Sequence, residues 1–118
     1  MANGQITKVL EDARKLIEKP ENWIQRAYYA INNEGKESYC ASGALHLAAG
    51  AARITQQKEM RFSLVNGFAG FDAAEYFMRA NNIDRNRSYV SHFNDNHTHA
   101  EILAAFDRAI EQAKKENA

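Results

Sequence analysis

One cysteine and a later His-x-Asn-Asp segment supply the residue types that nucleophilic catalysis uses. Cys40 is the only cysteine and stands just before a stretch that favours a helix. Free backbone N–H groups and the dipole at a helix start lower a thiol pKa and so favour a nucleophilic thiolate. His92 would accept the thiol proton, and Asn94 or Asp95 would orient the imidazole. This pattern is typical of cysteine-dependent hydrolases and transferases.

Cys40 also has a purely structural interpretation. Free cysteine is among the most buried residue types and packs as a small apolar side chain. The flanking Tyr39 and Ala41 suit such a core position. Whether Cys40 faces the core or a cleft decides between the two roles, and we favour a protein that is not an enzyme.

A histidine-rich stretch offers a second kind of chemistry. His92, Asp95, His97 and His99 lie within eight residues, and imidazole and carboxylate ligands suit zinc or a similar transition metal. Their spacing matches no metal motif with defined mechanics, and a structural zinc site normally has four ligands. We therefore expect no metal and no cofactor, and keep a transition-metal site as a third interpretation.

Aromatic residues gather before Cys40 and suit partner binding. Because a two-stranded ribbon has two faces, some of these rings are expected to face water, where exposed aromatics anchor contacts with other proteins. They could equally cover the helices beneath them. The candidates for binding another protein, or a second copy in a homodimer, are Trp23, Tyr28, Tyr29 and Tyr39.

Charge argues against nucleic acid and membrane as partners. Fifteen Lys and Arg balance fifteen Asp and Glu, so the chain lacks the global field that non-specific binding to either requires. Arg79, Arg85 and Arg87 could touch phosphates and Tyr89 could stack on a base, but such residues more often form a solvated loop. No run of 18 apolar residues and no signal peptide occurs, and the lone cysteine indicates a reducing, cytoplasmic setting.

The elements that must position these residues begin with a helix and a hairpin. Apolar residues recur at helical spacing from Ile6 to Ile17, and Pro20 blocks continuation, so this helix should end near Glu18. Residues 32–35, Asn-Asn-Glu-Gly, can supply the positive φ of a tight turn between two short strands. A small irregular hairpin is therefore expected before Cys40.

Helices should dominate the remainder of the chain. An Ala-rich helix is expected after Cys40, and a third helix should end before Gly67. Asp72 and Glu75 have capping-box spacing and should begin a short helix. Residues 89–95 suit a brief extended segment. Thr98 and Glu101 form a Thr-x-x-Glu capping box that should start the last helix.

Composition and pattern together predict a mainly α fold. The chain is 45% hydrophobic and 25% charged, with one Pro and six Gly, which is globular and too poor in turn residues for a many-stranded sandwich. We expect one compact domain over residues 1–118, with four to five helices and one small β-hairpin. The first and last helices should pack against the Ala-rich one.

Several short motifs taken together resemble a known family. They are Trp-Ile-Gln at 23–25, Tyr-Cys-Ala-Ser-Gly-Ala-Leu at 39–45, Phe-Asn-Asp at 93–95, Thr-His-Ala-Glu-Ile-Leu at 98–103 and Phe-Asp-Arg-Ala-Ile at 106–110. The set is similar to a family of small bacterial and phage proteins that form a domain of unknown function. The resemblance implies no activity, and it singles out Cys40, Asn94, Asp95 and Thr98.

Overall fold

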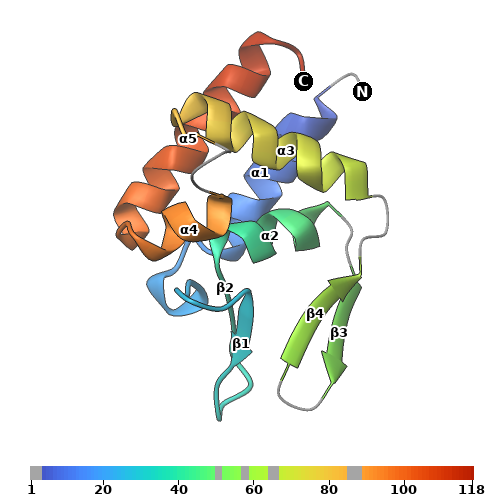
Figure 1. Cartoon of the computed structure of the whole chain (residues 1–118), viewed down its shortest axis with the longest axis vertical. Helices are drawn as coiled ribbons and strands as arrows, with labels where there is room; N and C mark the ends of the chain where they lie inside the picture. The colour runs from blue at the N-terminus through green and yellow to red at the C-terminus, as the bar shows by residue number, and fades with distance from the viewer. Residues whose placement is uncertain (1–3, 50–51, 57–58, 64–66, 85–88) are drawn as a thin grey trace.

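A helical body with two hairpins at one end makes up the protein (Figure 1). The computed structural model describes residues 4–49, 52–56, 59–63, 67–84 and 89–118, with side chains described outside 50–71. This part of the chain contains five α-helices and one short 3-10 helix. The mainly α fold with a small β-hairpin is thus confirmed.

The first and last helices follow their sequence signals. α1 (Gln5–Leu16) buries its apolar stripe, and Pro20 begins the separate 3-10 helix η1 (Pro20–Asn22). α5 (His99–Lys115) starts at a complete capping box, in which Thr98 Oγ1 accepts from Glu101 N at 3.2 Å and the Glu101 carboxylate accepts from Thr98 N at 2.8 Å. Both expected helices are therefore confirmed.

The core lies where four helices meet. α2 (Ala41–Ala48), the Ala-rich helix, packs against α1 and α3 (Gly67–Ala80). α5 packs chiefly against α1 and α3, and not against α2 as expected. Phe77 of α3 and Phe106 of α5 are fully buried with ring centroids 4.9 Å apart, so aromatic edge contacts join these two helices.

The expected hairpin is confirmed. β1 (Tyr29–Ile31) pairs antiparallel with β2 (Glu37–Tyr39). Asn32 Oδ1 accepts hydrogen bonds from the backbone N–H groups of Glu34 and Lys36, both at 2.9 Å. Gly35 has φ +79°, a value that L side chains rarely adopt, so the sequence 32–35 closes the turn as its residue types indicate.

Two expectations for the middle of the chain are wrong. A second antiparallel hairpin, β3 (Ala52–Gln56) and β4 (Glu59–Ser63), stands where a helix was expected before Gly67. α3 begins at Gly67 itself, so Asp72 and Glu75 lie inside this helix and do not cap it. The polar and apolar residues of Glu59–Ser63 alternate, which is the period of a strand, and this signal outweighs the helical spacing of Met60 and Leu64.

The segment before the last helix is also helical and not extended. α4 (Val90–Asp95) is a six-residue helix that packs against α2 and α3. A helix this short has little stability of its own, and it is held by contacts with residues distant in sequence. Figure 1 shows α4 next to the point where β2 runs into α2.

Candidate functional site

Cys40 occupies the junction between β2 and α2. It is the N-cap residue of α2, and its Sγ accepts a hydrogen bond from Gly43 N at 3.3 Å. Only 2% of Cys40 is exposed. The thiol therefore takes the place that Ser or Asp usually fills at a helix start.

The surroundings of Cys40 favour the protonated thiol. Burial raises the pKa of the Cys40 thiol to about 11, and the nearby Asp95 carboxylate acts in the same direction. Backbone N–H groups of Gly43 and Ser42 lower this pKa but do not outweigh burial. At pH 7 about one such thiol in ten thousand is ionised. Cys40 is thus a weak nucleophile in this environment.

Asn94 joins three separate segments beneath Cys40. Its side chain is fully buried, and its Oδ1 accepts from the Trp23 indole N–H at 2.6 Å and from Ala41 N at 2.9 Å. Its Nδ2 donates to Ile24 O at 3.0 Å and to Asp95 Oδ1 at 3.3 Å. Every polar atom of this amide is therefore used in holding the loop, α2 and α4 together.

Residues 23–26 are fixed against the end of α4 by further hydrogen bonds. Gln25 Nε2 donates to the backbone oxygens of Asn94, Asp95 and His97, at 3.2, 3.2 and 3.0 Å. Arg26 N donates to Asp95 Oδ1 at 2.7 Å, and Arg26 has φ +65°, which is costly for a residue with a side chain. The Asp95 contact holds the backbone in this turn.

A pocket opens beside the thiol. It has a volume of about 330 Å³ and is lined by Arg26, Ala27, Tyr28, Cys40, Ser91 and Asp95. Ser91 and Asp95 stand four residues apart on α4, which brings them to one side of the helix. The volume is near the lower end of the range of ligand pockets, about 300 to 1,000 Å³.

The proposed catalytic residues do not all lie at the pocket. Cys40 and Asp95 share the pocket, whereas Asn94 is committed to buried hydrogen bonds. His92 is exposed on α4 and is not among the residues that line the pocket. The described part of the chain thus presents a carboxylate to the thiol, and not an imidazole.

The histidines proposed as metal ligands are engaged elsewhere. His97 Nδ1 donates to Phe93 O at 2.7 Å, and His99 Nε2 donates to Ile17 O at 2.6 Å, because a carbonyl oxygen can only accept. The His97 ring stacks on Phe93 with centroids 3.8 Å apart. Within the described residues, no three His, Cys, Asp or Glu side chains form a group that could hold a metal ion.

The four aromatic candidates also separate by environment. Trp23 is partly buried, and its indole N–H donates to Asn94. Tyr39 is only 3% exposed. The hydroxyl groups of Tyr29 and Tyr39 both donate to the Glu37 carboxylate. Tyr28 is 50% exposed and lines the pocket, so it is the member of this group best placed for a partner.

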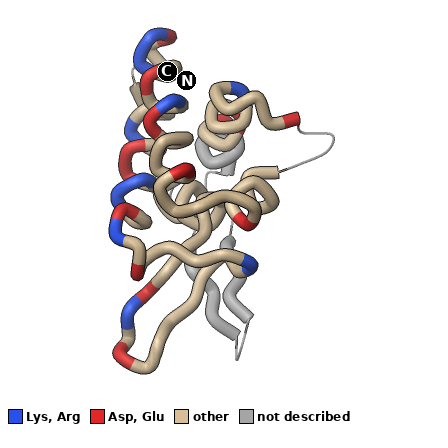
Figure 2. The backbone as a smooth tube through the Cα atoms, turned by 90° about the vertical axis from the view of Figure 1, so that its left-hand side faces the viewer, with Lys and Arg blue, Asp and Glu red and all other residues tan. Residues whose placement is uncertain are grey.

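The basic candidates show no common surface in the described residues. Arg79 lies near Glu116, with 3.8 Å between Nη2 and Oε2, and over the Tyr76 ring. Arg85 and Arg87 lie outside the described residues, and Tyr89 is 68% exposed. Figure 2 shows Lys and Arg interspersed with Asp and Glu along the helices at its left, which leaves no large region of one sign there.

Comparison with known protein families shows where this chain belongs. A model for a family of unknown function, DUF6197, matches residues 1–112, nearly the whole chain. The chain belongs to this family. No curated protein and no solved structure matches the chain. Among the described residues, no helix combines the length and apolar character needed to cross a membrane.

Three polar residues that build this DUF6197 member's site were not predicted as site residues from the sequence. Ser91 stands one helical turn before Asp95, a spacing that would have placed it beside that carboxylate had residues 89–95 been taken as helix. Gln25 and Arg26 act through a backbone turn and contacts about seventy residues away. Nothing local in the sequence indicates either role.

Proposed function

We propose that this protein works by binding another protein, through the surface around the pocket beside Cys40. The observation that carries this proposal is the half-exposed Tyr28 at a pocket that Cys40 also lines, where burial keeps the thiol protonated at neutral pH. A rigid aromatic side chain beside a concave site is the usual composition of a binding hot spot. The described residues have two other exposed large apolar side chains. Ile31 lies in β1, close in sequence to Tyr28, and Tyr89 lies at the start of α4.

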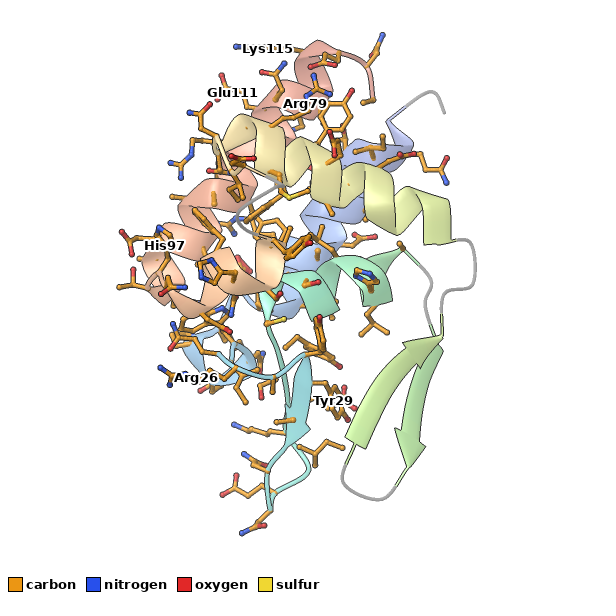
Figure 3. The ribbon with its side chains drawn as sticks, in the orientation of Figure 1. Arg26, Tyr29, Arg79, His97, Glu111 and Lys115 are labelled. Atoms are coloured by element: carbon orange, nitrogen blue, oxygen red, sulfur yellow. The ribbon has the colours of Figure 1, made fainter. Side chains whose placement is uncertain are left out.

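Photo-crosslinking tests this proposal directly. p-Benzoylphenylalanine in place of Tyr28 or Tyr89 should capture the same partner in cells. The same substitution at Lys115, at the opposite end of the molecule from Arg26 (Figure 3), is the control and should capture none. Equal capture from all three positions, or none from Tyr28, would contradict binding at this surface.

A cysteine-dependent hydrolase or transferase is the second candidate. It is favoured by the position of Cys40 at a helix start, next to a pocket that also holds Asp95. It is disfavoured by the thiol pKa of about 11 and by the absence of His92 from the pocket lining. Catalysis by thiolate attack needs a pKa nearer to neutrality.

Alkylation of Cys40 separates the two candidates. In folded protein, iodoacetamide should react slowly at neutral pH, with an apparent pKa near 11, and quickly once the chain is unfolded. A fast reaction in the folded state, with an apparent pKa below about 8.5, would support the enzyme instead. Replacement of exposed Asn96 by Ala is the control, since it should leave the rate unchanged.

The setting of this function is part of the proposal. The resemblance to small bacterial and phage proteins and the lone cysteine support a reducing cytoplasm as the place where the partner is met. The partner is either a different protein or a second copy of this chain. Fractionation of native cells, with the tagged chain recovered in the cytosol, is the expected result.

A further inference from the structure

Asp95 is the one carboxylate among the described residues that line the pocket beside Cys40. Asp95 forms no ion pair with any residue in the described ranges, and both groups that donate to its Oδ1, Arg26 N and Asn94 Nδ2, are neutral. Neutral donors bring no positive charge to a carboxylate, so a cationic group can still pair with it. Burial is the main cause of the raised pKa of Cys40, and the Asp95 carboxylate adds to it, so this charge also acts on the thiol.

The oxygens still available in the pocket favour one geometry. Asp95 Oδ1 already accepts two hydrogen bonds, and within the described residues its Oδ2 and the Ser91 hydroxyl have none. The forked contact of an arginine uses both carboxylate oxygens, and here only one is available. An ammonium group is a compact donor that one carboxylate oxygen and one hydroxyl can hold together.

Resting on the proposed function, we propose that the pocket receives a single lysine side chain of the partner protein, with Asp95 as its counter-ion. Ser91 accepts a second hydrogen bond from the ammonium group, and the Tyr28 ring contacts the lysine by a cation–π interaction or through its methylene chain. The protonated Cys40 thiol and Ala27 supply the less polar part of the wall.

Arg26 is the one positive side chain among the described residues that line the pocket, and it would oppose a lysine. Figure 3 shows its side chain directed outward at the edge of the molecule. Its backbone N–H donates to Asp95 Oδ1 at 2.7 Å. Neutralising this guanidinium should therefore strengthen binding of a lysine.

Short peptides test the inference on the intact chain. An acetylated, amidated Gly-Lys-Gly peptide should shift the amide resonances of Ser91 and Asp95 in a titration followed by NMR. The matched arginine peptide should bind at least about threefold more weakly, and the peptide with acetyl-lysine should not bind, because it lacks the charge. Equal binding of the acetyl-lysine or arginine peptide would overturn the inference.

Variants assign the site within the same titration. Asp95→Asn keeps an acceptor for Arg26 N and should weaken lysine binding by about fivefold to tenfold. Tyr28→Ala should weaken it and Arg26→Gln should strengthen it, with the melting temperature of each variant measured to show that it is folded. The control Glu34→Gln removes the same charge from the exposed hairpin turn and should leave the affinity unchanged. If Glu34→Gln and Asp95→Asn weakened lysine binding equally, the attraction would come from the net charge of the protein, and the proposed site would be wrong.

The experiments can contradict the lysine inference and the proposed binding function independently of each other. If crosslinking from Tyr28 captures a partner while no lysine peptide binds, the lysine inference fails and the binding function stands. If the peptide binds as described but no partner is captured from Tyr28 or Tyr89, the pocket chemistry stands and the binding function fails.

Discussion

At the scale of single residues, Asn94 holds the site together. It is fully buried and bonds to Trp23, Ile24 and Ala41. Asn94→Ala leaves the Trp23 indole N–H and the Ala41 N–H buried without acceptors, each at a cost of about 1 to 3 kcal/mol. We expect the free energy of unfolding, measured with urea, to fall by about 3 to 5 kcal/mol.

A neighbouring asparagine provides the control. Asn96 is exposed, and within the described residues its side chain makes one hydrogen bond, from Nδ2 to His92 O at 2.8 Å. Asn96→Ala should cost less than about 1 kcal/mol. If both substitutions had similarly small effects, the amide of Asn94 would not organise this junction.

Cys40 should make stability depend on alkaline pH. The pKa of its thiol is about 11 in the folded protein and 9.0 in an ordinary environment, so the folded state holds the proton more tightly. Its contribution is therefore complete below about pH 9 and is lost as the pH rises toward 11. Two pKa units correspond to about 2 to 3 kcal/mol.

Comparison with Cys40→Ala isolates this contribution. Tyrosines and lysines titrate over the same range in both proteins, so their effects cancel in the difference. We expect the stability advantage of the natural chain over Cys40→Ala, measured by urea unfolding, to shrink by about 2 to 3 kcal/mol between about pH 8 and pH 11. A constant difference across this range would mean that the folded thiol titrates normally.

At the scale of elements, the capping box of α5 should contribute measurably to stability. Thr98→Ala removes the acceptor for Glu101 N and should lower the free energy of unfolding by about 1 kcal/mol. Thr98→Ser keeps the hydroxyl and is the matched control, expected within about 0.5 kcal/mol of the natural chain. Equal losses in both variants would assign the effect to the Thr98 methyl group.

The elements that the sequence predicted are those with local signals. α1 and α5 have long apolar stripes and clear ends at Pro20 and Thr98, and the β1–β2 turn has Asn32 and Gly35 at the positions that need them. α4 is too short for a period to show, and α3 starts at Gly67, a residue that usually interrupts helices. Strand alternation in β4 was present but competed with a helical spacing.

The candidate site was predicted only in part, for a similar reason. Cys40 and Asp95 were selected by residue type, and both line the pocket. The pocket itself depends on the turn at Arg26 and on hydrogen bonds that link residues 69 to 72 positions apart. Such pairings carry no local pattern, and so their roles follow only from the folded chain.

At the scale of the whole molecule, the junction at Asn94 couples the β1–β2 hairpin to the helical body. Ile24 N donates to Tyr39 O at 3.1 Å, and Cys40 N donates to Tyr28 O at 3.3 Å, next to the segment that Asn94 holds. The amides of Asn32 and Gly35 lie at the exposed hairpin tip. Native-state hydrogen exchange should therefore show slower exchange at Ile24 and Cys40 than at the tip.

Asn94→Ala should remove this difference selectively. Without the buried amide, the hairpin base opens independently of the body, so the Ile24 and Cys40 amides should exchange almost as fast as the tip. The amides of Leu10 and Phe106, in the core helices, should lose protection from exchange only by the amount that the global stability falls. Thr98→Ala is the control, because it weakens the start of α5 and removes no hydrogen bond of Asn94. It should lower the protection of all slowly exchanging amides by the same amount. If Asn94→Ala also lowered the protection of all these amides equally, the hairpin and the helical body would open as one cooperative unit.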